Sequence, residues 1–174
     1  MQAPHHPEIQ KRPVLSGLDR LLADTETISH LTRRQVGLLT NHASTTGDGV
    51  PASKALNDRL RDAGGRPIRL FTPEHGMQLT AGAGEVVDHG IDPLTGLQVR
   101  SLYAHGRLDD DATFGAIDTL VIDLRDIGVR CYTYAATAAR AAHKAQDQGI
   151  EVIVCDRPNP LGPGADGPHP ESDR

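Results

Sequence analysis

The 174-residue sequence is poor in aromatic residues and in cysteine, and both scarcities limit what the protein can be. It has no Trp, two Phe and three Tyr, so we expect an aliphatic core and few rings that could stack on nucleic-acid bases. Its two cysteines, Cys131 and Cys155, belong to no CxxC pair and cannot build a disulfide framework. The chain must therefore fold through its hydrophobic core, for which its length is sufficient.

The sequence also lacks an excess of positive charge and any long apolar run. Lys and Arg number 18 against 23 Asp and Glu, which gives a net charge of −5. Binding to nucleic acid or to an anionic membrane relies on basic surface, so we expect neither partner. No apolar run reaches the roughly 18 residues of a membrane helix, and the N-terminus has no signal-peptide h-region. As written, the sequence predicts a cytoplasmic protein, or a secreted one if its true start lies upstream.

Proline and glycine divide the chain into three zones. Residues 1–13 are polar and carry three prolines, which predicts a disordered arm. Residues 157–174 hold five of the twelve prolines and three glycines, so we expect a Pro/Gly-rich tail without packed elements. Residues 14–156 alternate strand-like and helix-like segments and form the expected folded domain.

The apolar runs of this domain predict an α/β fold. Near-continuous apolar strands that alternate with helices are typical of a parallel sheet covered on both faces. Right-handed crossovers then produce a doubly wound, mainly parallel, five-stranded Rossmann-like sheet with helices on both faces. We expect strands at 35–40, 67–71, 98–103, 119–124 and 150–155, and helices at 14–24, 52–63, 109–116 and 132–148.

Polar residues stand close behind the predicted strands. In a doubly wound sheet the carboxyl ends of the strands share one edge, and ligands bind there. The residues that should gather at this edge are Asn41, Glu74, His75, Asp123, Arg130 and Asp156. The dinucleotide fingerprint GxGxxG and the P-loop are absent, and the GxGE fragment at 82–85 precedes no helix, so nucleotide binding is disfavoured.

The tetrapeptide Pro-Glu-His-Gly at 73–76 is a stronger indication of a functional site than the glycine pattern. It holds a carboxylate and an imidazole between a proline that ends the strand and a glycine that lets the backbone turn near a ligand. Glu74 can act as a general acid if partial desolvation raises its pKa. The alternative is that Glu74 caps or salt-bridges a loop, as loop glutamates commonly do.

A second polar cluster, residues 123–134, opens the last predicted helix. Asp126 can cap that helix, and Arg130 near its N-terminus can clamp a carboxylate or a phosphate. Tyr132 and Tyr134 can bind a sugar ring or pack the helix onto the sheet. For these residues a structural and a functional interpretation are both open.

Six blocks of the sequence carry a family resemblance. They are VGLLTNHAS (36–44), LFTPEHG (70–76), AGE (83–85), DPLTGLQVRSLY (92–103), DTLVIDLRDIGVRCYTY (118–134) and DRPNPLG (156–162). In this order and at this spacing they resemble the exo-β-N-acetylmuramidases (NamZ/YbbC-like), long labelled a domain of unknown function. The resemblance covers residues 14–168.

The resemblance implies a glycoside hydrolase that removes N-acetylmuramic acid from the non-reducing ends of peptidoglycan fragments. Its substrate would be a peptidoglycan-derived muropeptide or disaccharide, and it would need no cofactor and no metal. The family's fold implies a Rossmann-like N-terminal domain and a smaller C-terminal domain, with the site in the cleft between them. That second domain would begin at the 157–174 tail, so the chain alone would be incomplete and a separately encoded C-terminal domain is a candidate partner.

The resemblance also assigns residues to the site. It implies that Glu74 is the catalytic acid and that His75 orients its carboxylate. The residues that would line the cleft and bind substrate are Asn41, Glu85, Asp123, Arg130 and Tyr132, to which we add Asp156 from its place behind a strand. For Arg130 our own hypothesis is that it pairs with the lactyl carboxylate of muramic acid.

Two alternatives stay open. A non-catalytic muropeptide-binding module would keep the loops at the sheet edge but would lack turnover. A metal-dependent hydrolase would use His75, Glu74, Asp123 and Asp156, but these lack a tight ligand spacing such as HExxH and this alternative is the weaker. If a second domain packs on this one, we also expect exposed apolar surface near residues 77–91 and 157–168.

Overall fold

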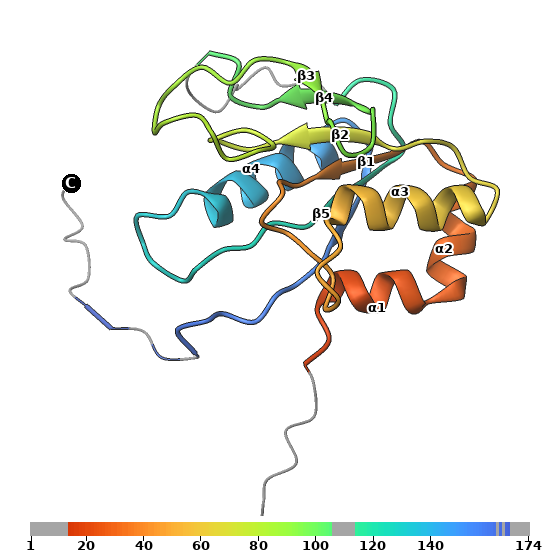
Figure 1. Ribbon diagram of the computed structural model, residues 1–174, viewed down its shortest axis with the longest axis horizontal. Helices are drawn as coiled ribbons and strands as arrows, with labels where there is room; N and C mark the ends of the chain where they lie inside the picture. The colour runs from red at the N-terminus through yellow and green to blue at the C-terminus, as the bar shows by residue number, and fades with distance from the viewer. Residues whose placement is uncertain (1–13, 106–113, 163, 165, 168–174) are drawn as a thin grey trace, which may run out of the picture.

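The computed structural model describes residues 14–105, 114–162, 164, 166 and 167. The predicted disordered arm at 1–13 and most of the predicted helix at 109–116 lie outside these residues, as does part of the predicted tail. The described chain forms one sheet with helices on both faces, which confirms the predicted α/β class (Figure 1).

The sheet has six strands in the order β3-β4-β2-β1-β5-β6. They are β1 (Val36–Leu39), β2 (Arg69–Thr72), β3 (Gly90–Ile91), β4 (Gln98–Ser101), β5 (Thr119–Ile122) and β6 (Glu151–Val154). Neighbouring strands are parallel except for β3 with β4. The five predicted strands are confirmed with four residues each, and β2 ends one residue later than predicted; β3 is a sixth strand. The sequence does not predict β3, because two residues inside a glycine-rich loop show no periodicity.

The helices of the described chain are α1 (Gly17–Ala23), α2 (Thr25–Thr32), α3 (Ala52–Asp62) and α4 (Tyr134–Asp147). Helix α1 begins at Gly17 because Ser16 and Asp19 form a capping box. Asp24 ends α1 and caps α2, where its carboxylate accepts from the backbone N–H of Glu26 at 3.1 Å. The sequence does not predict α2. Within the described ranges no helix is both long and apolar enough to cross a membrane.

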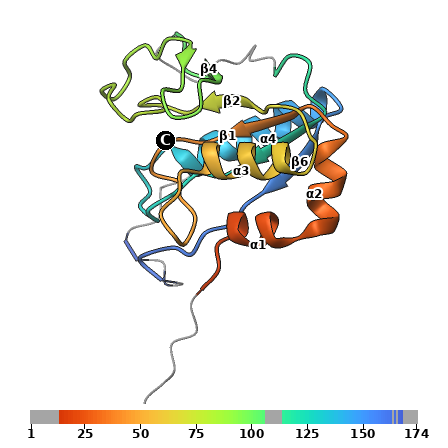
Figure 2. The same cartoon turned by 45° about the vertical axis from the view of Figure 1, so that its right-hand side comes forward.

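The two faces of the sheet pack against different helices. Val36 and Leu38 of β1 join the buried cluster under α1, α2 and α3, whereas Leu39 joins the cluster under α4. This follows from the alternation of side chains along a strand, and the helices on either side can be followed in Figure 1 and Figure 2. Helices on both faces explain why β1 and β5 are buried at every position.

The face under α4 is less aliphatic than the composition suggests. Both phenylalanines lie in it, with the ring of Phe71 edge-on to that of Phe114 and the ring centroids 5.1 Å apart. Gly37 makes room for this pair, since a Cβ at that position would lie 2.8 Å from the Phe71 ring. The described cluster on the opposite face is aliphatic as expected, whereas on this face Phe71, Phe114 and Tyr103 lie among mostly aliphatic side chains.

Candidate functional site

The carboxyl ends of the parallel strands form one edge of the sheet. Strands β2 and β4 lie on one side of β1, and β5 and β6 lie on the other. The crevice between the carboxyl ends of β1 and β5 is therefore the topological switch point, where doubly wound folds bind ligands. Asn41 follows β1, Glu74 follows β2, Asp123 follows β5 and Asp156 follows β6. The structure thus brings these predicted residues to one edge.

The Glu74 carboxylate is held on both of its oxygens and is only 9% exposed. One oxygen accepts from the backbone N–H of Gly84 at 3.0 Å, and the other accepts from the hydroxyl of Thr133 at 2.8 Å. The hydroxyl of Tyr134, the first residue of α4, donates to the Glu74 carbonyl at 3.4 Å. Glu74 therefore lies against the N-terminus of α4, where the helix dipole favours a negative charge.

These contacts hold the pKa of Glu74 below its usual value. The N–H of Gly84 has the largest effect, burial acts in the opposite direction, and the Thr133 hydroxyl and the nearby His75 add to the lowering. The condition under which Glu74 can act as a general acid, a pKa raised by desolvation, is therefore not met in this chain, because hydrogen bonds to the ionised form outweigh burial. At neutral pH the side chain of Glu74 is a carboxylate.

His75 has an unusual backbone conformation beside Glu74. Its φ is +70°, in the left-handed region that few residues other than glycine occupy, and Gly76 follows with a φ of +79°. Its ring Nδ1 donates to the carbonyl of Ala81 at 2.8 Å. The imidazole therefore holds the loop after β2, and the hydrogen bonds that orient the Glu74 carboxylate come from elsewhere. Strained backbone of this kind is concentrated at functional sites.

Asp123 and Arg157 form a buried ion pair at the switch point. The Asp123 side chain is fully buried and that of Arg157 is 9% exposed. Arg157 donates from Nε to one carboxylate oxygen at 2.6 Å and from Nη2 to the other at 2.8 Å, and Nη2 also donates to the carbonyl of Thr45 at 2.9 Å. Burial raises the pKa of Asp123, against the lowering effect of the guanidinium. Both Asp123 oxygens are thus engaged within the protein, and the three segments after β1, β5 and β6 are joined.

In the loop between β5 and α4, the structure distinguishes residues with a structural role from those that keep exposed surface. Asp126 accepts from the backbone N–H of Gly128 at 2.7 Å and from that of Ala135, the second residue of α4, at 3.1 Å, so it caps the helix. The rings of Tyr132 and Tyr134 contact each other with centroids 4.6 Å apart. Tyr134 is buried and packs α4 onto the sheet, whereas Tyr132 is half-buried and keeps exposed surface.

Three other predicted site residues have exposed side chains. Arg130 lies in the loop before α4, and Asp156 lies just after β6. Glu85 accepts from the backbone N–H of Gly82 at 2.7 Å, which closes a turn. That turn also supplies the N–H that binds Glu74, so in this structure Glu85 supports the catalytic candidate from the loop.

Asn41 is buried just after the carboxyl end of β1, and only the oxygen of its side-chain amide is hydrogen-bonded within the described residues. Its Oδ1 accepts from the backbone N–H of Ala43 at 3.1 Å, but its Nδ2 has no hydrogen-bond partner among the described residues. The hydroxyls of Ser44 and Thr72 are also buried without a partner in this part of the chain. Buried polar groups normally have partners, so these atoms suit a bound water or a polar group of a ligand.

A further polar network joins His42, which the sequence already places behind the first predicted strand, to Asp92, which sequence reasoning missed. One oxygen of the fully buried Asp92 accepts from His42 Nε2 at 2.9 Å, and the other accepts from the hydroxyls of Thr95 at 2.7 Å and Ser53 at 3.2 Å. The backbone N–H of His42 donates to the Met77 carbonyl at 2.9 Å. This network joins the loops after β1 and β2 to the turn before β4. Asp92 follows no parallel strand, so the rule that selects residues behind the strands does not find it.

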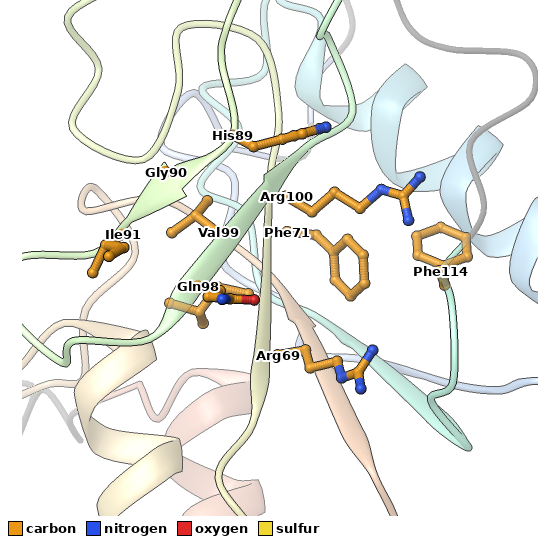
Figure 3. Close-up of a pocket in the computed structure, with 10 residues that line it drawn as sticks. Arg69, Phe71, His89, Gly90, Ile91, Gln98, Val99, Arg100 and Phe114 are labelled. Carbon is orange, nitrogen blue, oxygen red and sulfur yellow. The ribbon is translucent and has the colours of Figure 1, made fainter.

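A pocket of about 270 Å³ lies at the carboxyl edge beside β5 and β6, between the loop before α4 and the segment after β6. Tyr134, Asp156 and Arg157 are among the residues that line it. A larger hollow of about 760 Å³ lies against β2, β3 and β4, with Arg69 and Arg100 beside it (Figure 3). None of the predicted site residues lines the larger hollow, whereas Asp156 lines the smaller pocket, so we place the candidate site at the carboxyl edge of the sheet.

The fold and the site define the class of this protein: it is a doubly wound α/β domain with the buried carboxylate of Glu74 and a pocket at the carboxyl edge of the sheet. A family model described as "Exo-beta-N-acetylmuramidase NamZ, N-terminal" matches residues 36–173. The chain belongs to this family, and the resemblance inferred from the six sequence blocks is confirmed.

Individual relatives agree with the family match. The peptidoglycan β-N-acetylmuramidase NamZ of Bacillus subtilis (strain 168) is 35% identical over 153 residues, which are 88% of this chain and 36% of that protein. Two crystal structures of DUF1343 family proteins from Bacteroides fragilis superpose with TM-scores of 0.69 and 0.61, at 32% and 25% identity. They cover 85% and 86% of this chain and 35% and 36% of their own. The chain thus spans about a third of the length of these relatives.

Proposed function

We propose that this chain is the N-terminal part of a glycoside hydrolase, an exo-β-N-acetylmuramidase that removes N-acetylmuramic acid from peptidoglycan-derived muropeptides or disaccharides. Family membership supports the reaction, and the name of the Bacillus subtilis relative supports a peptidoglycan substrate. The observation that carries the proposal is the Glu74 carboxylate, buried at the carboxyl edge and held by Gly84 and Thr133. It stands where the family resemblance implies the catalytic acid.

In this proposal Glu74 gives a proton to the glycosidic oxygen of the leaving group. A general acid must hold that proton at the working pH, whereas the contacts of Glu74 in this chain lower its pKa. Burial is the one influence on Glu74 that acts in the raising direction. A second domain that covers the crevice would bury Glu74 further and raise its pKa. We therefore expect turnover only when that domain is present, and little turnover by this chain alone.

The remaining edge residues are proposed to bind the sugar. The Arg130 guanidinium suits the lactyl carboxylate of muramic acid, and the exposed part of the Tyr132 ring suits a sugar face. Asp156 can accept from a sugar hydroxyl, and the buried Asn41 amide can donate to an acceptor on the substrate. Asp123 acts through its pair with Arg157, which shapes the crevice.

The test is turnover of a chromogenic muraminide by the two-domain protein that contains this domain. Glu74→Gln should remove nearly all turnover and leave binding largely intact, because Gln keeps the size but cannot deliver a proton, an assistance worth about 10²–10⁴-fold. Glu85→Gln is the matched control and should cost less, since this carboxylate closes a turn. Arg130→Ala should mainly raise KM. Near-normal kcat in Glu74→Gln, with kcat abolished in Glu85→Gln, would assign the acid to Glu85 instead.

A non-catalytic muropeptide-binding module is the second candidate, favoured by the lowered pKa of Glu74. It predicts that the two-domain protein has no turnover and that muropeptide affinity is lost in Arg130→Ala but kept in Glu74→Gln. For the metal-dependent alternative, the structure offers no support. No three His, Cys, Asp or Glu side chains among the described residues come together as a metal site.

A further inference from the structure

Strand β6 is the last strand on its side of the sheet among the described residues. The backbone N–H groups of Glu151 and Cys155 donate to carbonyls on the β5 side, at 3.1 and 2.9 Å. Because the main-chain groups alternate in direction along a strand, the N–H and C=O of Val152 and Val154 face away from β5. In the described chain no further strand pairs with them.

The side chains of β6 are also more exposed than its sequence suggests. The interior strands β1 and β5 are buried at every position, whereas β6 is exposed at both ends and half-buried between. Val154 is 62% exposed. A Val-Ile-Val run is typical of a strand buried on both faces of a parallel sheet, yet this strand stands at the rim.

Hollows with apolar walls and polar rims flank β6 on both faces. On the side of α1 and α2, Leu15, Leu21 and Ile153 form the apolar wall of a hollow of about 560 Å³ that Arg20, Asp24 and Thr27 also line. On the side of α4, Val154 and Leu124 form an apolar wall of the pocket of about 270 Å³. Apolar surface that continues over a strand edge and both its faces marks a site of protein contact.

The opposite edge of the sheet is built differently. Strand β3 there is two residues long, antiparallel and exposed at both residues. Very short edge strands are one of the ways in which proteins prevent further strand addition. Strand β6 instead has the same four-residue length as β1 and β5, so only the β6 edge suits a new strand.

We propose that β6 is the docking edge for a further β-strand, supplied by the polypeptide that the relatives carry outside the matched third. More than half of the length of each relative lies outside the match, which is ample for such a strand. The strand would pair its main chain with Val152 and Val154, and its alternating apolar side chains would cover Val154 on one face and Ile153 with Leu15 and Leu21 on the other. The proposal concerns binding and does not depend on the muramidase activity proposed above.

The test combines the 174-residue chain with the portion of the Bacillus subtilis relative outside the matched third, produced as a second polypeptide. Calorimetry should detect a complex, and residue-resolved amide exchange should show new protection at Val152 and Val154. The amide of Ile153, which already faces β5, should change little. Contact through side chains alone would not produce this alternation.

Two variants at exposed edge positions make the test specific. Val154→Lys should weaken the complex roughly tenfold or more, because the ammonium would be desolvated against an apolar partner. Ile91→Lys on β3 is the matched control, since Ile91 is 68% exposed at the other edge, and it should leave binding unchanged. Circular dichroism checks that both variants fold. Equal weakening by both, protection without alternation, absence of a complex, or a dimer of the chain through β6 in light scattering would each overturn the proposal.

Discussion

The carboxylates at the candidate site are positioned by hydrogen bonds and ion pairs with neighbouring residues. Glu74 is positioned by an N–H from the loop after β2 and by a hydroxyl at the start of α4, and these contacts set its charge. Arg157 does the same for the switch point, where its guanidinium occupies both oxygens of Asp123. Loss of the Arg157 guanidinium would leave the buried Asp123 carboxylate without its partner.

Arg157→Ala should lower the free energy of unfolding by about 3–5 kcal/mol, because it leaves the fully buried Asp123 carboxylate without its partner. Urea denaturation followed by circular dichroism measures this. Arg125→Ala is the matched control, since Arg125 is exposed in the neighbouring loop and its loss should change the free energy by no more than about 0.5 kcal/mol. Equal effects of the two variants would show that the ion pair does not stabilise the fold.

Among the elements, helix α4 connects the fold to the site. Its N-cap residue Thr133 holds the side chain of Glu74, and its first residue Tyr134 holds the backbone carbonyl of Glu74. Its N-terminal N–H groups are capped from outside, by Asp126 of the preceding loop, because Thr133 at the N-cap position makes no side-chain cap itself. The position of this helix end therefore depends on one loop carboxylate.

Asp126→Ala should lower the free energy of unfolding by about 1 kcal/mol through loss of this cap. Asp147→Ala, at the other end of the same helix, is the control, and it should not lower the free energy of unfolding. An acid near a helix C-terminus is unfavourable, so its removal should leave stability unchanged or raise it slightly. Both variants can be compared by thermal unfolding. If Asp126→Ala matches Asp147→Ala, the cap contributes nothing.

For the whole molecule, hydrogen-bonded carboxylates connect stability to pH. Burial of Asp92 acts to raise its pKa, but the hydrogen bonds from Thr95, His42 and the Leu94 N–H outweigh burial and lower it. A carboxyl group whose pKa is lower in the folded chain stabilises the fold fully above its unfolded pKa. That contribution is lost as the pH falls through the folded pKa.

Asp92→Asn should therefore destabilise the protein most at neutral pH, and the difference from the unmodified chain should narrow as the pH falls below about 4. Urea unfolding at a series of pH values measures this difference. Asp48→Asn, at an exposed loop position, should produce no such convergence. A difference for Asp92→Asn that stays constant from neutral to acid pH would show that the ionised form is not what stabilises the network.

The sequence by itself determined the sheet, most of the helices and the edge at which the site lies. Near-continuous apolar runs such as those of β1 and β5 have to be buried on both faces, which requires a parallel sheet between helices. The carboxyl-edge rule then places Asn41, Glu74 and Asp156 together, because strand direction alone decides which ends meet. The short strand β3 and helix α2 carry too little periodic pattern to be predicted in the same way.

Only the tertiary structure decided which groups touch, and with that the charge of Glu74. Its carboxylate is held by a backbone N–H ten residues away and by the hydroxyl of Thr133, 59 residues away. Asp123 pairs with Arg157 across 34 residues. Hydrogen bonds weaken steeply over fractions of an ångström, and sequence spacing does not encode such distances between loops. The sequence therefore predicts that the site lies at the carboxyl edge of the sheet. The hydrogen-bond and ion-pair partners of each carboxylate, and with them the direction of its pKa shift, depend on how the loops pack.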